Sequence, residues 1–208
     1  MPKRYVAVAL ALAGLVGSAR TIWAQDNAAD ANALVEALKL GPGSVVAEIG
    51  AGGGELTMAI AKRVAPGGRV ISSELGAGRV QGLKEAIGKS ATNIEVIEGH
   101  ATRTNFPEGC CDAVFMRNVY HHFGDPPAMN ASILRALKPG GRVAVIDFPP
   151  RGNVATAPPE KRGDSAAHGV SAATLAAELT AAGFQIVKSE EQPSRSRWFI
   201  VVGQKPAS

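Results

Sequence analysis

One segment, residues 45–57, restricts the fold of this chain more than any other. An apolar run ends at Gly50, and two further glycines, Gly52 and Gly54, precede an apolar helical pattern. The run predicts a strand, and the glycines predict a tight turn whose backbone can approach a ligand closely. The helix that follows offers unpaired N–H groups at its start. The segment therefore predicts a strand–turn–helix unit that binds a nucleotide-like ligand.

The spacing of these glycines argues against a dinucleotide. The pattern G-x-G-x-x-G requires a glycine at position 55, where this chain has Glu55. A carboxylate at that position would repel a pyrophosphate, and the sequence has no Tyr-x-x-x-Lys pair typical of an oxidoreductase. An NAD-dependent oxidoreductase is therefore the least favoured interpretation.

Strand-like and helical patterns alternate along most of the chain. This alternation predicts an α/β fold with a doubly wound, mostly parallel sheet covered by helices on both faces. Asp125, followed by a proline, and Ser171 are expected to cap two of the helices. The last two strand-like runs predict an antiparallel hairpin at the edge of the sheet. The expected strands are 45–49, 69–73, 94–98, 113–117, 143–147, 184–187 and 198–202, and the expected helices are 28–40, 56–64, 126–137 and 172–182.

The first 24 residues have the pattern of a secretory signal peptide. Positive charges precede an apolar run at 6–16, small residues follow it, and no acid occurs before Asp26. The run is too short to span a bilayer comfortably, so we expect cleavage after Ala19 or Ala24. An uncleaved signal anchor and an organellar transit peptide are the alternatives. The expected organisation is a signal peptide at 1–24 and a single domain at 25–208, exported to the periplasm, or cytoplasmic if the leader does not function.

Charge and cysteine content limit the possible partners. Three of the 22 basic residues lie in the leader, and its removal leaves 19 basic and 18 acidic residues without a basic stripe. Nucleic acid is therefore not an expected partner, and no membrane span is expected after cleavage. Cys110 and Cys111 are adjacent and cannot link distant segments. They are expected to be a buried small hydrophobe and a turn residue, with a metal-binding dithiol or a redox pair as the alternative.

Several motifs together resemble the class I S-adenosylmethionine-dependent methyltransferases. Residues 48–54 match the acid-x-Gly-x-Gly-x-Gly motif of that family, and Glu74 lies 24 residues after Gly50, where the family has a carboxylate. The runs DAVFMRNVYHHF and LKPGGRVAVIDF resemble the family's fourth strand with its exit and its fifth strand. With its leader, the chain resembles bacterial methyltransferase-domain proteins that carry signal peptides. The resemblance implies the class I methyltransferase fold and S-adenosylmethionine as cofactor.

The resemblance also implies which residues bind the cofactor. Glu74 would accept hydrogen bonds from both ribose hydroxyls, because its two oxygens match a vicinal diol. His100 stands where the family usually has an acid that contacts adenine, so the imidazole or the backbone of Ala101 would take that role. The implied cofactor-binding residues are Glu48, Gly50, Ala51, Gly52, Gly54, Glu74, His100, Ala101 and Asn118.

The exit of the fourth strand supplies the candidate catalytic residues. Tyr120 and His122 are candidates for a general base, which methyl transfer needs only when the acceptor is a hydroxyl or a protonated amine. The alternative is that His121 and His122 pack and bond the backbone, and without a third ligand at metal spacing they predict no metal site. Asp147 and His168 are expected at the same edge of the sheet.

The expected function is methyl transfer to a small-molecule acceptor that the sequence does not identify. A domain that binds S-adenosylmethionine or S-adenosylhomocysteine without turnover is the main alternative, since export would separate the protein from the cytosolic cofactor. Residues 149–170 form a long segment without periodicity, which is either a binding loop or surface slack. The sequence does not indicate an oligomeric state.

Overall fold

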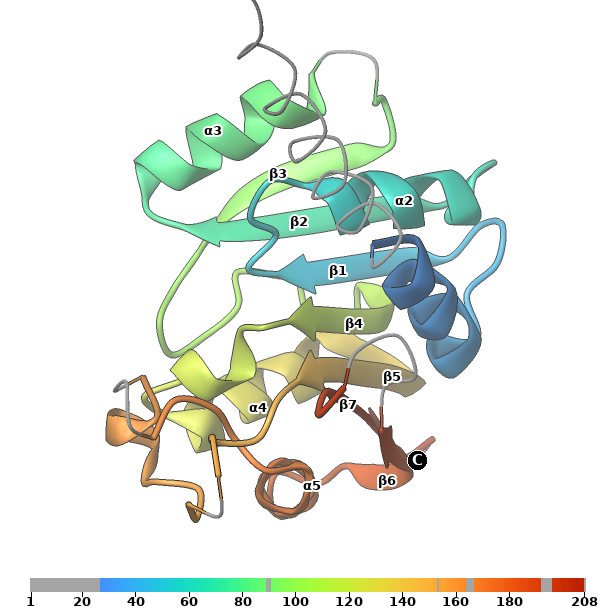
Figure 1. Ribbon diagram of the computed structural model, residues 1–208. Helices are drawn as coiled ribbons and strands as arrows, with labels where there is room; N and C mark the ends of the chain where they lie inside the picture. Colours follow the sequence, from blue (N-terminus) through green and yellow to red (C-terminus); the bar gives the residue numbers. More distant parts are fainter. Residues whose placement is uncertain (1–26, 89–90, 153, 164–166, 192–195, 208) are drawn as a thin grey trace, which may run out of the picture.

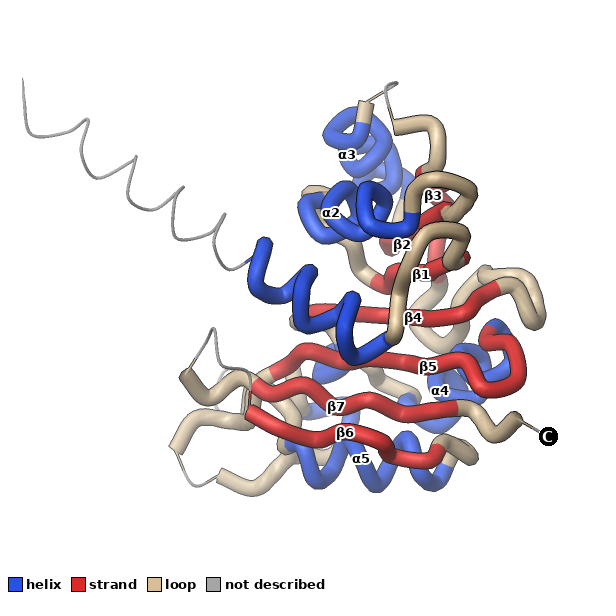
Figure 2. Tube along the Cα trace, turned by 90° about the vertical axis from the view of Figure 1, so that its right-hand side faces the viewer, coloured by secondary structure: helices blue, strands red, loops and turns tan. Residues whose placement is uncertain are grey.

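A computed structural model describes residues 27–207, except for 89–90, 153, 164–166 and 192–195. Within these residues the chain forms a seven-stranded sheet in the order β3-β2-β1-β4-β5-β7-β6. The first five strands along the chain are parallel, and β7 runs antiparallel to both β5 and β6. Figures 1 and 2 show this sheet crossing the molecule, with helices on both sides. The predicted fold class, including its antiparallel final pair, is confirmed.

The elements follow the expected alternation. A helix at residues 27–38 precedes the first strand. The strands are β1 (Val45–Ile49), β2 (Arg69–Leu75), β3 (Ile94–Gly99), β4 (Cys111–Arg117), β5 (Leu137–Asp147), β6 (Gln185–Glu191) and β7 (Phe199–Gln204). The helices are α2 (Glu55–Val64), α3 (Ala77–Ile87), α4 (Pro126–Ala136) and α5 (Ala172–Ala181), with short 3₁₀ turns η1 (Tyr120–His122) and η2 (Pro159–Lys161).

Two hydrophobic layers cover the two faces of the sheet. On one face the helix at 27–38 and α2 pack against β1, β4 and β5, and α3 packs beside α2 over β2 and β3. On the other face α4, α5 and η1 enclose a second layer. Strands with apolar residues on both faces are the expected consequence of such double coverage. The predicted caps are present, since the side chains of Asp125 and Ser171 accept backbone N–H bonds at the starts of α4 and α5.

The observed bounds differ most from the predicted ones around α4 and β5 and in the last two strands. α4 ends at Ala136 and β5 begins at Leu137, so Pro139-Gly140-Gly141 lies inside a strand rather than in a turn. The register between β4 and β5 shifts at Cys111, and such irregularities accommodate proline and glycine in a strand. β6 and β7 also extend beyond the predicted ranges.

The adjacent cysteines form a vicinal disulfide between Cys110 and Cys111, with a Cα–Cα separation of 3.7 Å. Cys111 is buried in β4 and Cys110 precedes the strand, as expected, but the bond between the two sulfurs was not predicted. The disulfide joins neighbouring residues at the start of β4, so it does not cross-link distant segments.

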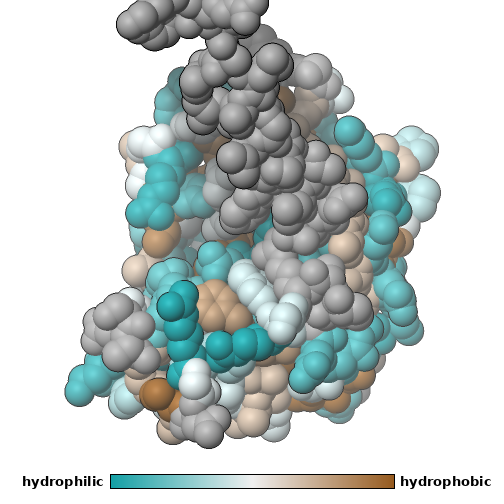
Figure 3. All heavy atoms as spheres, in the orientation of Figure 1, coloured by the Kyte–Doolittle hydropathy of each residue, from teal (hydrophilic) through white to brown (hydrophobic). Residues whose placement is uncertain are grey.

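The surface is mixed in polarity. On the face shown in Figure 3, hydrophobic residues of the described part form separate patches among hydrophilic ones. Leu75, Val154 and Val187 are the large hydrophobic residues that are most exposed. Among the described residues, no helix has both the length and the apolar character needed to cross a membrane. The predicted signal peptide lies outside the described residues. The described residues fold around one sheet.

Candidate active site

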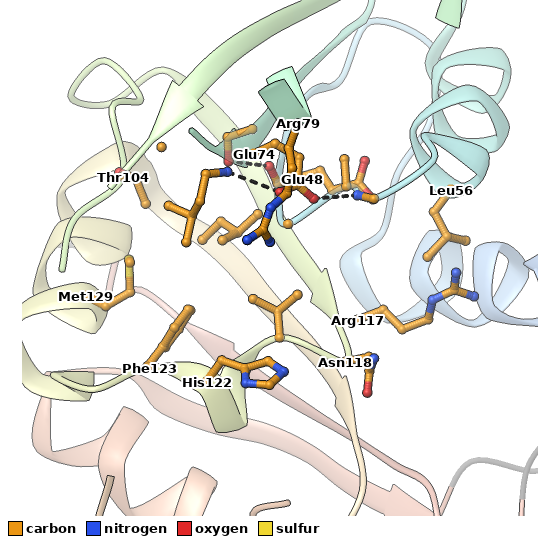
Figure 4. A pocket seen from close by; sticks show the side chains of 18 of the residues that line it. Glu48, Leu56, Glu74, Arg79, Thr104, Arg117, Asn118, His122, Phe123 and Met129 are labelled. Carbon is orange, nitrogen blue, oxygen red and sulfur yellow. Dashed lines mark hydrogen bonds between the residues drawn. The ribbon is translucent and has the colours of Figure 1, made fainter. Parts of the chain in front are cut away.

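A cavity of about 730 Å³ lies at the carboxyl ends of the parallel strands. It is lined by the ends of β1, β2, β3 and β4 and by the segments that leave them, and Figure 4 shows its interior. Open α/β sheets bind ligands at this edge, where the chain reverses the direction in which it adds strands. The sheet order places that reversal between β1 and β4, directly at the cavity.

The glycine turn after β1 forms one wall of this cavity. Gly50 and Gly52 have φ values of 70° and 57°, a region that favours glycine. A Cβ on Gly50 would lie 2.5 Å from Val119, whereas a Cβ on Gly52 would meet no protein atom within 4 Å and would point into open space. Gly52 therefore leaves room for a ligand. Gly54, which was predicted to bind cofactor, instead caps α2 and packs against Leu83, outside the cavity lining.

Glu74 joins the glycine turn to the second strand. The backbone N–H of Gly52 donates to Glu74 Oε1 at 2.7 Å, and that of Leu75 donates to Oε2 at 3.1 Å. The side chain is nearly buried yet lines the cavity. Each carboxylate oxygen can accept a further hydrogen bond, so Glu74 can receive two hydroxyls of a vicinal diol. Glu74 thus lies in the cavity, and its contact with the ribose stays a prediction.

Glu48 lies deeper, at the base of the same wall. Its carboxylate accepts hydrogen bonds from the hydroxyls of Thr57 and Ser72. Burial raises the pKa of Glu48 from 4.5 to about 7, although these two hydrogen bonds and the nearby Arg117 act in the opposite direction. Glu48 therefore supports the turn from behind and presents only part of its side chain to the cavity.

The predicted adenine contacts lie at the rim of the cavity. His100 and Ala101 are exposed residues that follow β3 and line the cavity together with Thr104. None of these three residues has a carboxylate that could take the place of the acid usually found at the position of His100. Asn118 lines the cavity after β4 and has a φ of 61°, a conformation that non-glycine residues adopt at a cost of 1–3 kcal/mol as an order of magnitude. Ala51 also lines the cavity, beside Gly52.

The opposite wall consists mainly of residues that the sequence did not identify. Figure 4 shows Phe123, Met129 and His122 across the cavity from Glu74. Phe123 directly follows the predicted His122, so the exit of β4 was the available signal. Arg117 and Val119 lie in the same run, whereas Met129 belongs to the next helix. The lining residues of the whole cavity that were missed from sequence are Ile49, Gly53, Glu55, Leu56, Ser73, Leu75, Arg79, Gly99, Arg103, Thr104, Arg117, Val119, Phe123, Met129 and Trp198.

The two predicted catalytic residues have different environments. His122 is exposed and lines the cavity, and its pKa is lowered mainly by desolvation and then by the neighbouring imidazoles of His121 and His168. Tyr120 is fully buried and does not line the cavity. Its hydroxyl donates to Glu178 at 3.0 Å and accepts from Asn130 at 2.8 Å, so both of its roles are structural. Burial raises the pKa of Tyr120, which further argues against the predicted catalytic role.

A cluster of histidines lies beside the cavity. Asp147, at the end of β5, accepts from His121 Nδ1 at 2.8 Å, and His121 Nε2 lies 2.9 Å from His168 Nε2. His121 is fully buried, whereas His168 is half-buried and reaches the cluster from the long loop. Asp147 and His168 therefore do share one edge of the sheet, as the sequence predicted.

Comparisons with known proteins agree with this architecture. Residues 47–145 match the family profile described as a methyltransferase domain. The ubiquinone/menaquinone biosynthesis C-methyltransferase of Ectopseudomonas mendocina is 36% identical over 121 residues, covering 54% of this chain and 44% of that protein. The phosphoethanolamine N-methyltransferase of Triticum aestivum is 34% identical over 118 residues, covering 55% and 22% respectively.

A solved structure extends the likeness beyond the matched segment. A SAM-dependent methyltransferase from Aquifex aeolicus superposes with a TM-score of 0.71 at 22% identity, covering 84% of this chain and 89% of that one. The chain spans less than half the length of the two curated relatives named above. The sheet, the glycine turn and the family match define a Rossmann-like methyltransferase domain. Residues 47–145 therefore carry a methyltransferase domain, and the described residues have the fold of S-adenosylmethionine-dependent methyltransferases, in agreement with the motifs.

Proposed function

We propose that this chain transfers the methyl group of S-adenosylmethionine to a small-molecule acceptor. The observation that carries the proposal is a single cavity with two unlike walls. One wall holds the glycine turn and Glu74, which suit the nucleoside of the cofactor. The other wall holds His122 and Phe123, and the space between the two walls can hold an acceptor beside the cofactor.

The residues of the second wall would orient the acceptor and take up its proton. The bound cofactor supplies a methyl group that its sulfonium already makes electrophilic, so alignment is the main task of the protein. His122 has a lowered pKa and is therefore neutral at neutral pH, a state in which it can accept a proton from a hydroxyl or an amine.

The composition of the second wall favours an aromatic acceptor. The named activities of the curated relatives involve a quinone nucleus in one case and a phosphorylated amine in the other. Phe123 and Met129 on this wall provide apolar and aromatic surface that suits a planar ring, and Trp198 lines the cavity as well. A reduced quinone or a related phenol is therefore the acceptor class that we favour.

The test is turnover with a defined panel of acceptors. Purified protein is incubated with S-adenosylmethionine and either a demethylated quinol, a simple phenol or phosphoethanolamine, and S-adenosylhomocysteine is measured by mass spectrometry. Product formation with the quinol or phenol supports the proposal. Tight cofactor binding without product from any acceptor would favour the alternative, a non-catalytic binding domain.

The protein would act outside the cytoplasm, in the periplasm. The leader pattern supports this location, and the vicinal disulfide of Cys110 and Cys111 suits an oxidising compartment. A cytoplasmic location remains the alternative if the leader does not function.

A further inference from the structure

Three imidazoles from two distant segments converge beside the cavity. His121 and His122 belong to η1, whereas His168 lies near the end of the long loop after β5. One ring nitrogen from each residue lies within 4.8 Å of the others. The His121 and His168 rings approach most closely, with their Nε2 atoms 2.9 Å apart.

A buried carboxylate orients the central imidazole. Asp147 Oδ1 accepts from His121 Nδ1, and Asp147 Oδ2 accepts from the backbone N–H of His121 at 3.2 Å. Both side chains are fully buried. This contact places the ring proton of His121 on Nδ1, so the lone pair of Nε2 points toward His168. Metal-binding histidines in proteins commonly have such a carboxylate partner.

Backbone contacts hold the long loop so that His168 reaches this point. The N–H of Val170 donates to the carbonyl of Phe148 at 3.0 Å, and Gly169 packs so tightly that a Cβ would lie 2.8 Å from that carbonyl oxygen. Earlier in the loop, the buried guanidinium of Arg162 forms an ion pair with Glu178 of α5. The third imidazole is therefore positioned by packing and not merely by its place in a surface loop.

We propose that His121, His122 and His168 bind a divalent transition-metal ion, with Zn²⁺ as the favoured ion. Imidazole nitrogens suit Zn²⁺, and three protein ligands with an open fourth position are typical of sites that also bind water or a substrate. Zn–N bonds of about 2.1 Å in a tetrahedral arrangement require nitrogens about 3.4 Å apart. The 2.9 Å separation of His121 and His168 would need to widen by about half an ångström, and the three nitrogens, which lie within 4.8 Å of one another, would need to draw together around the ion.

The competing explanation is a hydrogen bond between two histidines. In that arrangement His168 donates its Nε2–H to the lone pair of His121 Nε2. A metal ion would take the place of this proton once neutral His168 carries its proton on Nδ1. The cysteines offer no thiolate ligand, because Cys110 and Cys111 are joined in a disulfide.

Zinc binding to the whole protein tests the proposal directly. Competition with a chromophoric chelator should give one Zn²⁺ per chain, and Zn²⁺ should raise the melting temperature. His168→Ala and His122→Ala should each weaken binding by more than the roughly 10- to 100-fold loss typical of outer-shell partners, and Asp147→Asn should fall within that range. Co²⁺ should give the visible bands of a tetrahedral site without a thiolate charge-transfer band.

His100→Ala is the matched control, because His100 is the one histidine of the chain that is not a proposed ligand. It should leave zinc affinity unchanged. His122 is exposed and His168 is half-buried, so both variants are expected to fold, which their melting temperatures in chelator would verify. Unchanged affinity in His168→Ala and His122→Ala proteins of normal stability would overturn the proposal.

The position of the metal would matter for the acceptor. His122 lines the cavity as well as belonging to the cluster, so a metal ion held there would lie beside the space left for the acceptor. An acceptor oxygen bound there would lose its proton more easily, and in the metal-bound protein this effect would replace His122, then a ligand, as the means of removing the proton. This role rests on the proposed methyl transfer, whereas the binding measurements do not require turnover. If the protein binds zinc but shows no methyl transfer, the proposed metal site stands and only the proposed function is contradicted.

Discussion

Glu74 combines a structural and a binding role in one carboxylate. Its two oxygens hold the N–H groups of Gly52 and Leu75, and the same oxygens face the cavity. The glycine turn and the ribose contact are therefore mechanically linked, since removing the carboxylate frees the turn as well. A loss of cofactor affinity is the expected consequence.

Glu74→Ala should weaken binding of S-adenosylhomocysteine by about 1.5–3 kcal/mol, the range for hydrogen bonds to a charged group. Calorimetry measures this value. Glu85→Gln on the exposed side of α3 is the control and should bind normally. Equal affinity of wild type and Glu74→Ala would remove Glu74 from the ribose site.

Glu48 makes the stability of the apo protein depend on pH. Burial raises its pKa to about 7, so the folded state keeps its proton to a higher pH than the unfolded state, whose value is near 4.5. The contribution to stability is fully present below about 4.5 and is lost as the pH rises through about 7. The pKa difference corresponds to at most about 3 kcal/mol.

Glu48→Gln should abolish this decline, because an amide does not ionise in this range. Urea unfolding at several pH values from 5 to 8 should show the wild type losing stability relative to the variant. Glu85→Gln again serves as the control, and its curve should follow that of the wild type. Parallel curves for Glu48→Gln and wild type would contradict a raised pKa at this position.

Sequence reasoning identified residues where chemistry and local spacing coincide. The glycine turn and Glu74 were found because a strand, a turn and an acid occur at fixed offsets. His168 could be placed at the right edge of the sheet but not beside His121, because 46 residues separate them and no periodicity describes the loop between. The prediction of a catalytic Tyr120 failed because its partners, Asn130 and Glu178, belong to other helices, so its burial could not be seen in the local sequence.

Elements with strong local patterns were predictable, and those shaped by their neighbours were not. The predicted range for β1 agrees with the structure, and that for α2 differs by one residue. α3 was not predicted as a separate helix, because Gly78 and Gly82 weaken its helical pattern. β5 begins before its Pro-Gly-Gly sequence because it pairs with β4 there, a contact that is invisible in the sequence.

The long loop is an element in its own right, and at Gly169 its end packs against the residues that follow β5. Gly169→Ala should destabilise the protein by about 1–3 kcal/mol, because the new Cβ overlaps the backbone of residues 148–150 and φ is +121°. Chemical unfolding measures this change, and limited proteolysis should cut residues 149–170 faster than in wild type.

Gly152→Ala provides the matched control within the same loop. Gly152 also has a positive φ, of +67°, but a Cβ there would meet no atom within 4 Å. Its cost should be limited to the backbone strain of about 1–2 kcal/mol. A Gly169→Ala protein that resists proteolysis as well as Gly152→Ala does would show that the loop is not held at this point.

At the scale of the whole molecule, the cofactor side and the acceptor side have different origins in the chain. The family match covers residues 47–145, which include the glycine turn, Glu74 and His122. Trp198 and His168 lie beyond the match, the first in the lining of the cavity and the second in the histidine cluster. The family match therefore includes the residues predicted to bind the cofactor, whereas the acceptor must be identified by experiment on this chain.

Export, which the leader pattern predicts, would determine whether the whole molecule has access to the cofactor. Residues 1–30 fused to a periplasmic reporter should be exported and shortened, as the positive start, apolar run and small residues predict. Reporter activity and the mass of the mature fusion measure the two steps separately. Leu10→Asp with Leu12→Asp interrupts the apolar run and should keep the fusion in the cytosol. A wild-type fusion that remains cytosolic at full length would contradict export, and the protein would then meet S-adenosylmethionine where the cell makes it.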